Sequence, residues 1–96
     1  MNTKKQKKSR NVTEATKKKV AGKQLYRCAN KHGSNVVEDY DCPMWSNEKY
    51  NGNFDESGYD IDHIEEYSIN QNNSIENLQA LCKSCHSVKT KQFMRF

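Results

Sequence analysis

Two sets of residues in this sequence have the types and spacing to do chemistry. One is a set of four cysteines: Cys28, Cys42, Cys82 and Cys85. The other is the neighbouring pair Asp62 and His63. A carboxylate is a hard oxygen ligand suited to Mg²⁺ or Mn²⁺, and a histidine near neutral pH can take a proton from water. Side by side, they could hold a metal and generate a nucleophile on one substrate. Neighbours on a regular strand point to opposite faces, so the strand must end or bulge here.

The stretch Cys82-x-x-Cys85-His86 fits c-type haem attachment, half of a zinc site, or a zinc half-site whose histidine serves another purpose. Thiolates at i and i+3 in a tight turn can chelate one zinc ion, which needs two further ligands. Haem attachment would require export and an apolar pocket, and it would leave Cys28 and Cys42 unexplained. We therefore predict a structural Zn²⁺ held by the four cysteines. The alternative is that His32 replaces one of them.

Length and composition predict one small domain. The chain has 96 residues, of which 33% are hydrophobic, and its mean hydropathy is −1.14. A chain this short and polar buries a modest core and needs a staple such as a metal site. The first twenty residues contain no apolar segment of a signal peptide, and no run reaches membrane-spanning length. We therefore expect an intracellular protein (host cytoplasm or nucleus), not secreted and without a membrane partner, whose thiols bind metal instead of forming disulfides.

Charge is unevenly distributed along the chain. Residues 1–20 hold eight lysines and arginines against the single acid Glu14, whereas residues 21–96 hold eight basic and eleven acidic residues. A dense block of like charges is typically disordered and contacts a polyanion. We predict a disordered basic tail over 1–20 that binds phosphates without sequence preference, or that only aids solubility, followed by a folded domain over 21–96. Residues 13–25 could alternatively form a short helix.

Hydrophobic periodicity places the chemical residues on a strand and a helix. Alternation of Tyr59, Ile61 and His63 against polar residues predicts a strand over 59–64. A short strand is expected over 24–28, a turn at Asn51-Gly52, and a helical turn or strand over 75–81. Residues 82–96 lack Gly and Pro and show helical spacing, which predicts a C-terminal helix.

The combined pattern resembles a known family. Asp62-His63-Ile64 is followed by Asn77-Leu78-Gln79-x-Leu81-Cys82-x-x-Cys85-His86-x-x-Lys89-Thr90. This order resembles the HNH endonucleases, with His63, Asn77 and His86 matching the three letters. It covers residues 59–92 closely, and the chain also looks like short free-standing HNH proteins of bacteriophages and large DNA viruses. The sequence departs from the family pattern at two places. The first two cysteines have the spacing Cys28-x13-Cys42 and not C-x-x-C. Glu65-Glu66 stands where a proline often follows the Asp-His-Ile element.

The resemblance implies an α+β fold, a small zinc-stabilised ββα-metal (His-Me finger) domain. It implies a metal-dependent DNA endonuclease that hydrolyses phosphodiester bonds, by nicking or double-strand cleavage, with little sequence preference. In that reading His63 is the general base, Asn77 orients His63, and Asp62 and His86 bind a catalytic Mg²⁺ or Mn²⁺. The zinc fixes the start of the helix and so sets His86 against Asp62. Contacts to the DNA phosphate backbone are expected from four cations of the C-terminal helix: Lys83, Lys89, Lys91 and Arg95.

Two other functions stay open at this stage. One is a non-catalytic zinc-ribbon module that binds DNA, and the other is a small zinc-stabilised protein-interaction domain. Asp62 and His63 separate the nuclease from both, because a pure binding module has no need of this pair.

Overall fold

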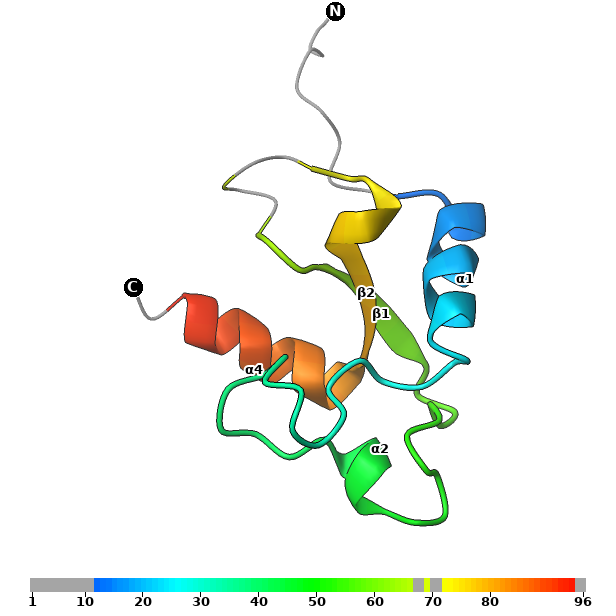
Figure 1. Ribbon diagram of the computed structural model, residues 1–96, viewed down its shortest axis with the longest axis vertical. Helices are drawn as coiled ribbons and strands as arrows, with labels where there is room; N and C mark the ends of the chain where they lie inside the picture. The colour runs from blue at the N-terminus through cyan, green and yellow to red at the C-terminus, as the bar shows by residue number, and fades with distance from the viewer. Residues whose placement is uncertain (1–11, 67–68, 70–71, 95–96) are drawn as a thin grey trace, which may run out of the picture.

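The computed structural model describes residues 12–66, 69 and 72–94. Over these residues a small two-stranded sheet lies between two helices (Figure 1). In chain order the elements are α1 (Glu14–Lys23), α2 (Pro43–Ser46), β1 (Tyr59–His63), the 3-10 helix η1 (Ile75–Asn77), β2 (Leu78–Cys82) and α4 (Lys83–Phe93). The described helices include none with the length and apolar character of a membrane span.

The sheet pairs β1 with β2 in antiparallel register. Tyr59 lies opposite Cys82 at one end, and His63 lies opposite Leu78 at the other. Because side chains alternate along a strand, Asp60 and Asp62 share one face of β1. β2 passes directly into α4, which lies over that same region of the sheet. The strand and the C-terminal helix predicted from periodicity are confirmed, and the segment 75–81 divides into η1 and most of β2.

Helix α1 covers the other face of the sheet. Thr13 caps its start by accepting a hydrogen bond from the backbone N–H of Thr16. Val20 and Ala21 are buried and pack with Leu78 and Ala80 of β2. The predicted disordered tail over 1–20 therefore needs correction within the described part: residues 14–20 are helical, because α1 supplies apolar side chains that close the sheet. Residues 1–11 lie outside the described residues.

The segment between α1 and β1 wraps around the end of the sheet where α4 begins. The strand expected over 24–28 is not formed; Leu25 and Tyr26 have φ of +56° and +57°, and a single bridge joins Arg27 to Asn53. The predicted Asn51-Gly52 turn is present, with φ of +50° and +86°. Glycine is required at position 52 because an added Cβ would collide with the Trp45 ring.

Buried residues form two clusters, one on each face of the sheet. The α1 side holds only four, whereas the α4 side is built around the cysteines: Cys28, Val37, Cys42, Met44, Leu81, Cys82 and Cys85. Four of the seven buried residues in the larger cluster are therefore cysteines, so this part of the core depends on thiols as much as on apolar side chains.

Candidate functional site

The four cysteines converge at the junction of β2 and α4. Their sulfur atoms all lie within 4.8 Å of one another, all four residues are buried, and none forms a disulfide. The Sγ atoms of Cys42 and Cys82 are 3.7 Å apart. Thiolates around a tetrahedral zinc at about 2.3 Å have sulfurs about 3.8 Å apart. The cluster therefore has the donor set and dimensions to hold a zinc ion.

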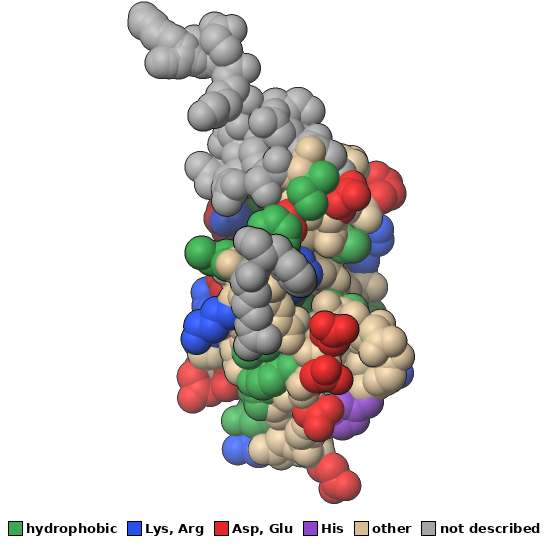
Figure 2. All heavy atoms as spheres, turned by 90° about the vertical axis from the view of Figure 1, so that its left-hand side faces the viewer, with side chains coloured by type: hydrophobic (Ala, Val, Ile, Leu, Met, Phe, Trp, Pro, Cys, Tyr) green, Lys and Arg blue, Asp and Glu red, His purple; other side chains and the backbone are tan. Residues whose placement is uncertain are grey.

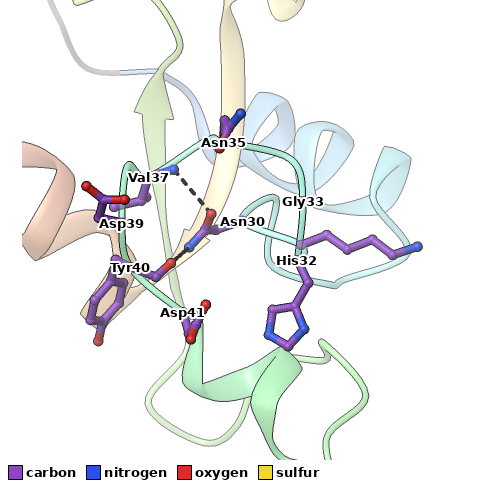
Figure 3. Close-up of a pocket in the computed structure, with 9 residues that line it drawn as sticks. Asn30, His32, Gly33, Asn35, Val37, Asp39, Tyr40 and Asp41 are labelled. Carbon is purple, nitrogen blue, oxygen red and sulfur yellow. Dashed lines mark hydrogen bonds between the residues drawn. The ribbon is translucent and has the colours of Figure 1, made fainter.

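A thirteen-residue loop separates Cys28 from Cys42, and Asn30 closes it. The Asn30 side chain donates to the Tyr40 carbonyl at 3.0 Å and accepts from the Val37 N–H at 3.2 Å (Figure 3). The same amide nitrogen lies 3.4 Å from the sulfur of Cys85. One buried asparagine thus holds the loop around a polar cavity and ties it to the thiol cluster. His32 lies at the rim of that cavity, exposed and near Ser46, and it does not join the cysteines.

The start of α4 favours thiolates. Cys82 is its N-cap residue and Cys85 lies in its first turn, where free backbone N–H groups and the helix dipole stabilise negative charge. The Cys28 thiol, followed by Cys85, lowers the pKa of Cys82 to about 7. The Cys28 thiol is also the main cause that lowers the pKa of Cys42. Neighbouring thiols raise the pKa of Cys28 and of Cys85. Metal ligation requires the thiolate form, so a bound cation would displace the protons of these two cysteines.

A second group lies between β1 and α4. Oδ1 of Asp62 is 3.7 Å from Nε2 of His86. Asp62 is buried, with 5% of its surface exposed, while His86 is partly exposed. Two ligand atoms each about 2.1 Å from one cation lie about 3.0 Å apart at a right angle and about 4.2 Å apart across it. The observed separation lies between these limits, so the pair fits a shared divalent cation.

The other oxygen of Asp62 is already occupied. Oδ2 accepts a hydrogen bond from Gln79 Nε2 at 2.9 Å, across the two strands, and pairs with Lys89 Nζ at 3.0 Å. Lys89 also contacts Glu66 Oε2 at 2.8 Å and the His63 carbonyl at 3.2 Å. Burial lowers the pKa of Lys89, but Glu66 and Asp62 outweigh that effect and raise it. The carboxylate is therefore fixed with only Oδ1 directed at His86.

The imidazole of His86 is held from the opposite side. Its Nδ1 lies 2.9 Å from Oδ2 of Asp60, and Oδ1 of Asp60 accepts from Lys83 Nζ at 2.5 Å. Burial raises the pKa of Asp60, but hydrogen bonds from Lys83 and His86 outweigh it, so the pKa lies below its ordinary value. Asp60 is thus an ionised carboxylate beside His86.

His63 occupies the last position of β1. It is paired with Leu78 in the same register that pairs Asp62 with Gln79, so the strand ends after the Asp62–His63 pair and not between its two members. Nε2 of His63 is 2.7 Å from the side-chain oxygen of Asn73. The ring is the donor of this hydrogen bond in the Nε2–H tautomer, in which Nδ1 is the basic nitrogen. A general base uses that nitrogen.

Asn77 does not make the predicted hydrogen bond to His63; Asn73 makes it instead. Asn77 is buried, and its side chain bonds the backbone N–H and carbonyl of Glu65 and the carbonyl of Asn72. Its own carbonyl accepts from Ile64 N–H at 2.7 Å. Asn77 therefore joins the two ends of the β1–β2 connection. Its side-chain amide forms hydrogen bonds with backbone groups that have no partner in the strand pairing.

The four cations predicted to contact phosphates from the C-terminal helix differ in exposure and in ion pairing. Lys89 is turned inward, with 15% of its side chain exposed, so the prediction that it contacts DNA is replaced by its role beside Asp62. Lys83 is half exposed and pairs with Asp60. Lys91 is exposed, and Arg95 lies outside the described residues.

Glu65 and Glu66 follow the Asp-His-Ile element and place two negative charges beside it. Glu66 is paired with Lys89, which compensates its charge. Acidic side chains are nevertheless prominent on the face in Figure 2, which looks onto the left-hand side of Figure 1.

Sequence reasoning missed Asp60, Asn73 and Gln79. Asp60 carried a usable signal, because it stands two residues before Asp62 and residues at i and i+2 share a face of a strand. Gln79 follows only from the register that places it opposite Asp62. Asn73 lies in a loop whose path no periodicity defines.

A sheet of two antiparallel strands followed directly by a helix, with Asp62 of the sheet facing His86 of the helix, defines a ββα-metal architecture. Residues 49–92, just under half of the chain, match the family model described as HNH endonuclease. That segment contains both strands, nearly all of α4 and the Asp62–His86 pair, and over it the chain matches an HNH endonuclease domain. The family supports a nuclease-type function that acts on DNA with divalent metals. Neither a curated protein nor a solved structure matches the chain.

Proposed function

We propose that this protein is a metal-dependent DNA endonuclease that hydrolyses phosphodiester bonds. The observation that carries the proposal is the 3.7 Å separation between Oδ1 of Asp62 and Nε2 of His86. Gln79 and Lys89 hold Asp62 at its other oxygen, and Asp60 holds His86 at its other nitrogen. Oδ1 of Asp62 and Nε2 of His86 therefore face each other. This is the support that a cation site requires from its surroundings.

Asp62 and His86 would hold a Mg²⁺ or Mn²⁺ ion. A bound cation polarises the scissile phosphate and stabilises the leaving oxygen. His63 accepts the proton of the attacking water at Nδ1, while Asn73 holds Nε2–H and fixes the ring. Asn77 keeps the connection that carries Asn73 closed, and so acts on His63 indirectly.

In this proposal the four cysteines would bind a structural Zn²⁺. The ion joins the Cys28–Cys42 loop to the start of α4, and α4 presents His86 one residue after Cys85. The DNA backbone is contacted by cations outside the Asp62 network: Lys91, Arg95, half-exposed Lys83 and the basic segment before α1. Such contacts hold phosphates and carry little sequence information, which favours cleavage with little sequence preference.

The test is nicking of supercoiled plasmid by zinc-loaded protein in buffer with Mg²⁺, with Mn²⁺ or with neither. We expect nicking only with an added divalent ion. Replacing His63 with alanine should lower the rate about 10²–10⁴-fold, as for loss of a general base. His32→Ala is the matched control, because His32 is an exposed loop histidine remote from Asp62, and it should retain full activity.

Full activity of His63→Ala protein would exclude His63 as the base. DNA that binds yet stays intact with both ions would instead support the non-catalytic zinc-ribbon module.

A further inference from the structure

Asp60 contacts the candidate site without belonging to it. Its Oδ2 lies 2.9 Å from Nδ1 of His86, and its Oδ1 bonds Lys83. Asp62, the residue expected to bind metal, lies on the other side of the same ring, near Nε2. The imidazole is therefore placed between two carboxylates, each of which faces a different nitrogen.

The two nitrogens of His86 cannot play the same role. An ionised carboxylate has no proton to donate, so the hydrogen bond to Asp60 requires a proton on Nδ1. In the neutral ring the lone pair is then on Nε2, the atom that faces Asp62. A histidine that binds metal commonly donates its other N–H to a carboxylate, which fixes the tautomer and the ring orientation.

We propose that Asp60 is a positioning residue that holds His86 in the Nδ1–H tautomer with Nε2 directed at Asp62. The metal part of this inference rests on the proposed function. Asp60 does not share the cation with Asp62, because it lies at the opposite nitrogen and Lys83 neutralises its second oxygen.

A purely structural role for Asp60 makes a different prediction. Asp60 also joins β1 to α4 through its ion pair with Lys83, so its loss could act by loosening the helix. Lys83→Met removes that ion pair but leaves the hydrogen bond from Nδ1 to Asp60. If Asp60 positions His86, Lys83→Met keeps the tautomer, whereas Asp60→Asn changes it.

The direct test is ¹⁵N–¹H NMR of the His86 ring nitrogens in zinc-loaded protein without Mg²⁺ or Mn²⁺, at a pH of about 8, where imidazole is neutral. The wild type should show a protonated Nδ1 and an unprotonated Nε2. Asp60→Asn should shift the population toward Nε2–H, because an amide can turn its NH₂ toward the ring; the same change beside a catalytic histidine in serine proteases gives the wrong tautomer. Asp39→Asn is the matched control: it is exposed, has φ of +54°, a conformation that asparagine tolerates, and should leave the spectrum unchanged.

Titration with Mn²⁺ gives a second readout. Asp60→Asn should weaken binding about 10–100-fold, the usual effect of losing the outer partner of a ligand, while Lys83→Met and Asp39→Asn should not. A wild-type ring with its proton on Nε2 would overturn the inference, and so would an Asp60→Asn variant with the wild-type tautomer and affinity. The wild-type spectrum decides the tautomer even if the variant fails to fold.

The two proposals can fail separately. A protein with the Nδ1–H tautomer that binds no Mn²⁺ would contradict the proposed function but support the positioning by Asp60. A protein that binds Mn²⁺ and nicks DNA with its proton on Nε2 would contradict the positioning alone.

Discussion

Side chains around Asp62 show how a buried carboxylate is accommodated in a small polar protein. Asp62 is buried, and a buried carboxylate must be hydrogen bonded or paired to remain ionised. Gln79 and Lys89 satisfy Oδ2, and Glu66 shares the ammonium of Lys89. Lys89 therefore neutralises two carboxylates beside the site, a task that keeps it away from DNA.

We predict opposite effects for two lysines of α4. Lys89→Met leaves Asp62 and Glu66 without their cation, and should lower the free energy of unfolding by about 1–3 kcal/mol. Lys91→Met should change stability by less than about 0.5 kcal/mol, but should reduce the salt dependence of DNA binding by about one phosphate contact. For both variants, denaturant titration measures the free energy of unfolding, and DNA binding at several salt concentrations measures the phosphate contact. The assignment is wrong if Lys89→Met keeps wild-type stability and loses the phosphate contact.

Among the elements, α4 depends most on the cysteine cluster. The helix starts at the end of β2 without a side-chain cap, and its first turn is held by Cys82 and Cys85. Cys28 reinforces the junction, because its sulfur accepts from the Cys82 N–H at 3.3 Å. A metal at this point would fix both the start and the direction of α4, and thus the place of His86 relative to β1.

Cys85→Ser should remove zinc and stability together. Binding energy at a structural zinc site is folding energy, so we expect zinc content to fall from about one ion per chain and thermal unfolding to lose cooperativity. Ser87→Ala, an exposed change on the same helix, should affect neither. Elemental analysis and circular dichroism provide the two measurements, and folded wild-type protein that contains no zinc would exclude the clamp.

At the scale of the whole molecule, positive charge and folded structure overlap more than the sequence suggested. Five basic residues precede position 12: Lys4, Lys5, Lys7, Lys8 and Arg10. The lysines that follow belong to α1, whose Val20 and Ala21 close one face of the sheet. The boundary of the folded unit therefore lies before α1 and not at residue 20.

Two truncations should separate these roles. Removing residues 1–11 should leave the free energy of unfolding unchanged and lower the slope of log affinity for DNA against log salt by up to about 4.5, since each of the five basic residues contributes about 0.9. Removing residues 1–23 should also destabilise the fold by about 2 kcal/mol or more, because burial of Val20 is lost. Equal stability of both truncated proteins would show that α1 is dispensable.

The sequence by itself determined the chemistry. The four cysteines, Asp62, His63 and His86 are recognisable because each lies in a short motif, and motif spacing is a local property of the chain. The strand and the C-terminal helix followed from local periodicity in the same way, and the ββα-metal class followed from the resemblance of the motif order to the HNH endonucleases.

Only the tertiary structure decided which partner each of these groups takes. Asp60 and His86 are separated by 26 positions, Lys89 and Glu66 by 23, and Asn73 rather than Asn77 meets His63. Such pairings depend on the register of β1 with β2 and on where α4 crosses them. Those are set by burial on both faces of the sheet, which involves the whole chain at once and leaves no signature at any single position.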